Sequence, residues 1–246
     1  MRKKTSALAL VLGLLSSPAR AADPFVPAAA QTRSSDAKTR YDGAEALASI
    51  PGPRSLAILE KLLAGDADGR VRQAAASALG RLGDASAATA LIAALRDASP
   101  PARFAAVRAL GALRAGAAVP ALSALLGDPD PSMRRTAALE LGQIGDPAAK
   151  EALKGSLADS DEGARLEAAG ALARMGDVSG QAAALDGLRS TDRVSRRRAA
   201  LVLAQGGGAS ALPPLDAALA VEKDPATRAA IGKARARLRE RLGLKK

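Results

Sequence analysis

Arginine and aspartate are the residues of this sequence whose spacing could support chemistry. An arginine recurs every 31 residues, in a column formed by Arg72, Arg103, Arg134, Arg165 and Arg196. Aspartates precede these arginines, as Asp66 and Asp68 precede Arg72. Guanidinium groups at a fixed pitch could bind an anion, or they could pair with the aspartates within or between repeats. We call the repeated arginines and their aspartates the arginine ladder. A feature that every repeat shares is better explained by the needs of the fold, so we expect this ladder to be structural.

Other kinds of chemistry find few residues to support them. The 246 residues include no His and no Cys, which removes the usual acid–base groups, thiol nucleophiles and most transition-metal ligands. Gly206–Gly208 lacks the lysine of a phosphate-binding loop, and the paired carboxylates of Asp128 and Asp130 are too few for calcium. We therefore expect no enzymatic activity, no metal site and no cofactor.

Short helices must carry the ladder. Residues 128–131 (Asp-Pro-Asp-Pro) have the side chains that cap a helix and open its first turn. An apolar stripe follows at helical spacing, formed by Met133, Ala137, Leu141 and Ile144. Residues 145–147 (Gly-Asp-Pro) end that helix and begin another. The same pattern returns 31 residues away in both directions, so the chain is a repeat array.

The array has a small-residue interior. Hydrophobic residues make up 48% of the chain and aromatic residues 1%, so alanine and leucine must fill the core. Their columns are Ala75, Ala106, Ala137, Ala168 and Ala199, and Leu79, Leu110, Leu141, Leu172 and Leu203. We expect a first helix over 35–49 and helix pairs at 54–81, 85–112, 116–143, 147–174, 178–204 and 210–242.

The repeated pattern D-x-D-x-x-[VM]-R-x-x-A-x-x-x-L-G-x-[LI]-G-D is clearest at 66–84 and 128–146. It resembles HEAT repeats, specifically the short bacterial HEAT-like kind found in phycobilisome lyases, and the resemblance covers about 35–242. It implies an all-α fold, a right-handed α-solenoid of about six helix pairs plus an N-terminal helix. It also implies that the arginine-bearing second helices line the concave surface and that the terminal repeats act as caps.

The positive charge lies at the two ends of the chain. The net charge is +11, and residues 1–21 and 222–246 carry most of the excess. Residues 1–21 combine a basic start, a short apolar run and a small-residue cleavage site, which predicts a signal peptide and a protein exported to the periplasm or the medium. A buried N-terminal helix is the alternative. Residues 22–34 contain two prolines and show no periodicity, so we expect a flexible lead, followed by the solenoid over 35–246.

Positions of the second helices that change between repeats are the candidate binding site. They mix arginine, one aromatic residue and leucine, types that anchor protein interfaces, and acids enter only as neighbours such as Glu140 and Glu167. We predict a non-enzymatic scaffold that binds a protein partner along this concave strip. The alternative is that these residues form a solvated face that binds no partner. The candidates are Phe104, Arg108, Arg135, Leu139, Gln143, Arg174, Arg197 and Leu201.

An alternative function uses the basic C-terminal region. Arg193, Arg196, Arg197 and Arg198 begin one helix, where the helix dipole disfavours cations, and the last helix adds Arg235 and Arg239. These residues could bind an acidic lipid, polymer or nucleic acid, or they could form a solvated face and a capping helix. The scarcity of aromatic residues argues against nucleic acid. A third possibility is an accessory factor to an enzyme, since some HEAT-like relatives are implied to assist bilin attachment.

Overall fold

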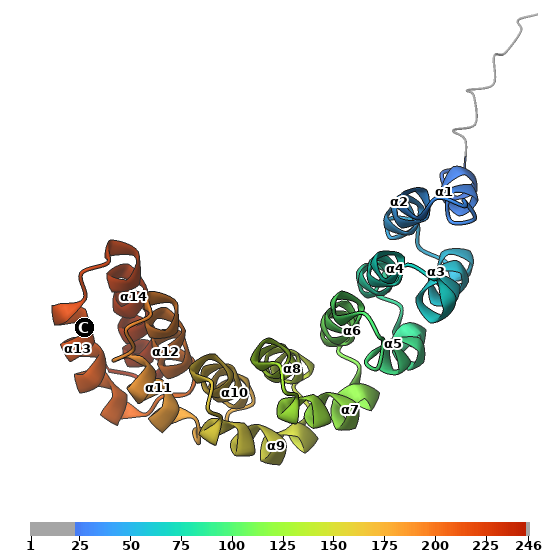
Figure 1. Cartoon of the computed structure of the whole chain (residues 1–246). Coiled ribbons are helices and arrows are strands. Elements are labelled where there is room, and N and C mark those ends of the chain that lie inside the picture. Colours follow the sequence, from blue (N-terminus) through green and yellow to red (C-terminus); the bar gives the residue numbers. More distant parts are fainter. Residues whose placement is uncertain (1–22, 245–246) are drawn as a thin grey trace, which may run out of the picture.

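The computed structural model describes residues 23–244, and over this range it contains helices and short 3-10 turns but no strand. Fourteen α-helices follow one another in a curved row, and each packs mainly on its neighbours along the chain (Figure 1). This arrangement is an α-solenoid and confirms the all-α prediction. The signal peptide predicted over 1–21 lies outside the described residues.

The helices form two layers (Figure 1). The outer layer consists of α3 (Pro53–Gly65), α5 (Ala88–Ala94), α7 (Val119–Ala124), α9 (Lys150–Gly155), α11 (Gln181–Gly187) and α13 (Leu212–Val221). The inner layer consists of α2 (Ala37–Leu47), α4 (Gly69–Leu82), α6 (Pro100–Ala112), α8 (Pro131–Ile144), α10 (Glu162–Arg174), α12 (Arg193–Gly206) and α14 (Pro225–Arg241). The six predicted pairs are present, and the arginine-bearing second helices face the concave side.

The predicted flexible lead is wrong, because residues Phe25–Gln31 form helix α1. Asp23 accepts a hydrogen bond from the Phe25 backbone nitrogen at 3.0 Å. The guanidinium of Arg54 in α3 lies 4.0 Å from the centre of the Phe25 ring, which attaches α1 to the next pair. Ala28 and Ala29 are buried. Seven residues are too short for a helical period to stand out, which is why the sequence pattern missed α1.

The residues that cap the two ends of the inner helices follow the repeat. Asp68 and Asp130 cap α4 and α8 by accepting hydrogen bonds from backbone nitrogens two residues on. The ends of these helices use glycine in the left-handed region, Gly83 at φ 73° and Gly145 at φ 75°. Arg114 occupies the equivalent position in the repeat between them and adopts φ 48°. The outer helices are shorter than predicted because 3-10 turns replace their ends, among them Ala85–Ala87, Gly116–Ala118, Leu125–Gly127, Pro147–Ala149, Ser156–Ala158 and Ala209–Ala211.

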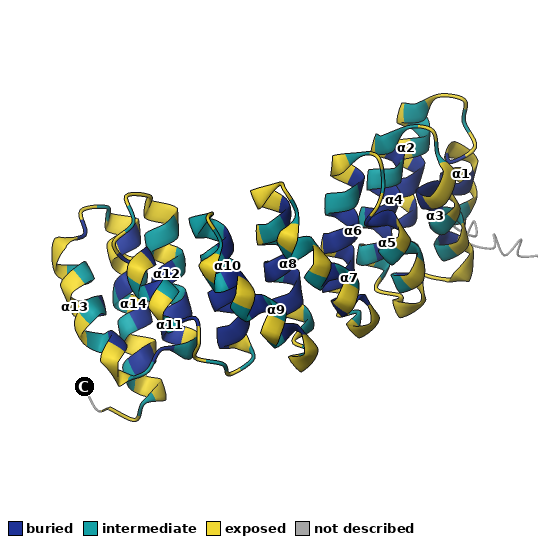
Figure 2. Cartoon of the chain, turned by 60° about the horizontal axis from the view of Figure 1, so that its bottom comes forward, coloured by how far each residue is buried: buried dark blue, intermediate teal, exposed yellow. Residues whose placement is uncertain are grey.

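The core is a continuous seam of alanine and leucine between the helices. The predicted leucine column, from Leu79 to Leu203, is fully buried. Buried residues lie where helices face their neighbours, whereas the turns at both edges are exposed (Figure 2). A Cβ added to Gly80 would lie 2.9 Å from Ala109, so α4 and α6 cross at a distance that only small residues permit. None of the described helices is long and apolar enough to cross a membrane.

Candidate partner-binding face

The arginine ladder joins each repeat to the next. Nε and Nη2 of Arg72 donate to the two carboxylate oxygens of Asp97, each at 2.7 Å, and Nη1 donates to the Asp66 carbonyl at 2.8 Å. Both side chains of the pair are largely buried. The Arg72 guanidinium holds the pKa of Asp97 below its usual value. Equivalent pairs join Arg40 to Asp66, Arg134 to Asp159 and Arg196 to Glu222. The ladder is structural, as the sequence predicted.

Two arginines of this ladder do not form the ion pair. Arg103 donates to the Asp97 carbonyl at 2.9 Å, but among the described residues no ion pair joins it to Asp128. Arg165 donates to the Asp159 carbonyl at 2.7 Å, and Ser190 stands where other repeats carry an acid. The interfaces between α6 and α8 and between α10 and α12 therefore hold together without this ion pair.

Glu140 is a second irregularity of the α6–α8 interface. Neighbouring repeats have alanine at this position, Ala109 and Ala171. Glu140 is 4% exposed, and its carboxylate lies where a Cβ at Gly111 would be. Among the described residues no hydrogen bond is made to this carboxylate. Burial raises the pKa of Glu140 to about 7, although the positive charges of Arg108 and Arg174 oppose that rise.

The structure brings Phe104 and Arg108 together in a groove between α4 and α6. The groove has a volume of about 450 Å³, and its larger side chains are Gln73, Ser77, Arg81, Phe104 and Arg108. Phe104 packs partly on the core, and Arg108 is exposed. Arg108 makes no hydrogen bond or ion pair with any residue that the structure describes. It is therefore available to an incoming group.

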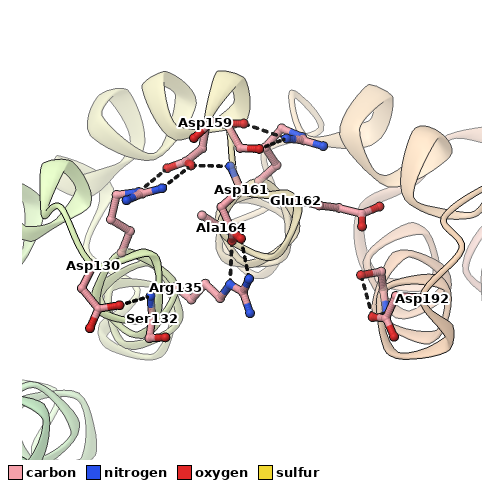
Figure 3. A network of polar contacts seen from close by, with 12 residues as sticks. Asp130, Ser132, Arg135, Asp159, Asp161, Glu162, Ala164 and Asp192 are labelled. Carbon is pink, nitrogen blue, oxygen red and sulfur yellow. Dashed lines mark hydrogen bonds and ion pairs between the residues drawn. The ribbon is translucent and has the colours of Figure 1, made fainter.

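In the middle of the predicted strip, the arginines already bind other residues of the chain. Arg135 on α8 donates through Nε to Asp161 at 2.6 Å, and its second nitrogen also binds that carboxylate (Figure 3). Arg174 lies back across α8, where Nε donates to the Gly142 carbonyl at 3.3 Å and Nη2 to the Leu139 carbonyl at 3.4 Å. Burial lowers the pKa of Arg174. Both guanidinium groups thus already hold neighbouring helices together.

The remaining predicted residues lie apart from the α4–α6 groove. Leu139 is half-buried and Gln143 exposed on α8. On α12, Arg197 is exposed and forms no ion pair with a described residue, and Leu201 is half-buried. The predicted residues therefore share one face without gathering in one pocket.

A second groove contains acids that, apart from Glu167, were not predicted on this face. It has a volume of about 490 Å³ and lies between the N-terminal ends of α8, α10 and α12. Asp161, Glu162, Glu167 and Asp192 line it together with Arg135 and Arg198. Figure 3 shows Glu162 and Asp192 on facing helices. The expectation of a strip with few acids fails here, because Asp161, Glu162 and Asp192 lie at helix starts, where capping also accounts for acidic residues.

The cations proposed for anion binding mostly have carboxylate partners already. Arg196 binds Glu222 at 2.6 Å, Arg193 lies 3.9 Å from Asp224, and Arg198 and Arg235 pair with Glu167 and Asp216. These pairs explain how cations are tolerated at the start of α12. No group of three or more acids that could hold a metal ion occurs in residues 23–244.

Comparison with known proteins identifies the repeat. The family model described as HEAT repeats matches residues 3–80, 22–98 and 88–173, which together make up more than half of the chain. The chain belongs to the HEAT-repeat family. No curated protein sequence matches it significantly.

Solved structures share the fold of this HEAT-repeat protein. YibA of Escherichia coli is 21% identical with a TM-score of 0.64, and the match covers 88% of this chain and 81% of YibA. The complex of CpcE and CpcF of phycocyanin lyase from Nostoc sp. PCC7120 gives 23% identity, a TM-score of 0.62 and coverage of 91% and 98%. An archaeal HEAT-like repeats protein from Thermococcus onnurineus NA1 is 19% identical with a TM-score of 0.57, and the match covers 82% of this chain and 93% of the archaeal protein. At these identities the likeness shows the fold alone.

Proposed function

We propose that this HEAT-repeat protein is a non-enzymatic scaffold that binds a protein partner along its concave face. The observation that carries the proposal is the combination, in a groove of that face, of Phe104 with Arg108, which forms no ion pair with any described residue. Aromatic and arginine side chains anchor protein interfaces when a partner covers them. Arg197 and Leu201 extend the same face on α12.

The fold supports this proposal because the stacked inner helices offer a long concave surface (Figure 1). The CpcE–CpcF structure, which shares the fold, is itself a complex of two named chains. Binding on a stacked frame needs surface complementarity and no covalent step. The anionic-surface alternative receives less support, since four of its six arginines are engaged by carboxylates of the chain itself.

A capture experiment with two matched variants tests the proposal. The first variant replaces Arg108, Arg135 and Arg197 of the inner helices by alanine. The control replaces Lys61, Arg96 and Arg189, three exposed cations of the outer layer, so that both variants lose three positive charges. Tagged proteins are incubated with envelope fractions at low and high salt, and the bound proteins are quantified by mass spectrometry.

We expect the inner variant to capture at least about tenfold less of the specifically bound protein than the wild type does, while the control captures as much as the wild type. Circular dichroism at 222 nm verifies that both variants remain helical. Equal capture by the wild type and both variants would contradict a concave binding face. Capture lost in the control alone would assign binding to the outer layer.

A further inference from the structure

The α4–α6 groove differs in charge from the groove at the starts of α8, α10 and α12. Two arginines, Arg81 and Arg108, line it, and no acid does. The groove at the α8, α10 and α12 helix starts contains four acids and two arginines, and both arginines are paired with acids of the same groove. The two grooves therefore have opposite charge.

The α4–α6 groove also combines charge with an apolar floor. Phe104 and Arg108 are four residues apart on α6 and thus lie on the same side of that helix. Gly80, Ala105 and Ala109 form the bottom between the two helices. Arg81 reaches across to Glu45 of α2 at 2.8 Å, which leaves Arg108 as the lining cation without an ion pair among the described residues.

We propose that the α4–α6 groove binds a segment of a protein partner in which an acidic residue stands beside an apolar one. The carboxylate of the segment receives hydrogen bonds from the Arg108 guanidinium, and the apolar side chain contacts Phe104 and the small residues below it. This inference rests on the proposed function and adds the chemistry of the partner. A guanidinium binds a carboxylate through two parallel hydrogen bonds, which fixes the orientation of the segment.

The acidic groove gives the binding its position along the solenoid. An acidic segment placed against Glu162 and Asp192 would face like charges, whereas the same segment at Arg108 faces an opposite charge. Discrimination between two sites can come from an attractive element at the right site, from a repulsive element at the wrong site, or from both. The two grooves supply both on one face.

Glu140 links this binding to proton uptake. Arg108 of α6 and Arg174 of α10 are the charged groups that act on the Glu140 carboxylate from the helices on either side of α8. A ligand carboxylate at Arg108 adds negative charge near Glu140 and draws on the same guanidinium. Glu140 is consequently easier to protonate when the groove is occupied, and the segment binds more tightly when Glu140 is neutral.

Fluorescence anisotropy with defined peptides tests the inference on the full chain. The first peptide is a fluorescein-labelled 12-residue sequence that alternates glutamate with leucine; the others replace glutamate by glutamine or by lysine. Each is titrated with wild-type protein, Arg108→Ala and the matched surface variant Arg96→Ala, at pH 6 and pH 8. Arg96 is an exposed arginine that follows α5 in the outer layer.

We expect the glutamate peptide to bind at least about tenfold more tightly than the other two. Arg108→Ala should abolish that difference, and Arg96→Ala should retain it. Binding of the glutamate peptide should be tighter at pH 6 than at pH 8 in the wild type, and Glu140→Gln should remove the pH dependence.

Equal binding of the three peptides, or no binding of the glutamate peptide, would overturn the inference. An Arg108→Ala protein that still prefers the glutamate peptide, with its helicity intact, would do the same. These outcomes are separate from the scaffold proposal, which depends on capture of a partner by the concave face as a whole.

Discussion

Replacement of Glu140 by glutamine tests how the concave face is held together. The side chain keeps its shape in this variant but loses its titration. In the wild type, burial raises the pKa of Glu140 from an ordinary 4.5 to about 7. One pKa unit corresponds to about 1.4 kcal/mol, so the ionised carboxylate lowers the free energy of unfolding by about 3 kcal/mol above pH 7.

The direction of the effect follows from which state holds the proton. Below pH 4.5 the carboxyl is protonated in both the folded and the unfolded chain, and it contributes no pH dependence. Between pH 4.5 and pH 7 the unfolded chain releases the proton first, so the folded state becomes progressively less stable. Above pH 7 both states are ionised and the destabilisation is constant. A buried amide has its own cost, about 1–3 kcal/mol, but that cost does not depend on pH.

The assay is urea denaturation followed by circular dichroism at 222 nm, at several pH values from 5 to 8. We expect the stability of Glu140→Gln relative to the wild type to rise by about 2.5 kcal/mol over this range. Glu151→Gln serves as the control, because the Glu151 side chain is 85% exposed. Parallel pH profiles for the wild type and Glu140→Gln would refute the assignment of Glu140 as a buried, unpaired acid.

Further predictions concern the ladder, the core and the N-terminus. Arg134→Ala leaves the Asp159 carboxylate buried without its partner and should lower the free energy of unfolding, measured by urea denaturation, by roughly 3–5 kcal/mol. Arg103→Ala breaks no ion pair between described residues and should lower it by about 1 kcal/mol. Equal losses would contradict the structural role of the ladder ion pairs. Leu141→Ala should lower stability by about 2–5 kcal/mol, and an unchanged thermal melt would show that the repeat register is wrong. Export predicts a mature chain that begins near Ala22, which N-terminal sequencing of the expressed protein checks; an intact Met1 would argue against cleavage.

The helical repeat could be predicted from the sequence because each repeat contains the same pattern of residues. Leucine and alanine columns at a 31-residue spacing fix which sides of the helices are buried, and aspartate and glycine mark their ends. Helix α1 was missed because its seven residues form less than a full amphipathic repeat and depend on contacts such as that between Arg54 and Phe25.

The candidate site was harder to predict, because partners on adjacent repeats decide which side chains are available. Arg108 and Arg135 are both arginines of the predicted strip, yet Arg135 pairs with Asp161, whereas Arg108 forms no ion pair with a described residue. The burial of Glu140 likewise depends on Gly111, which lies one repeat earlier and provides the space. Neither relation is visible from a residue's own helix.

The α6–α8 interface has a mechanical consequence. It lacks the Arg103–Asp128 ion pair and contains the buried Glu140 carboxylate, whereas the α4–α6 and α8–α10 interfaces have their ion pairs. Interfaces in a solenoid bear load in series, so a pull on the two ends is taken up first at the weakest one. We expect such a pull to open first the two interfaces that lack the ladder ion pair, α6–α8 and α10–α12, and ionisation of the buried Glu140 carboxylate to weaken the α6–α8 interface further.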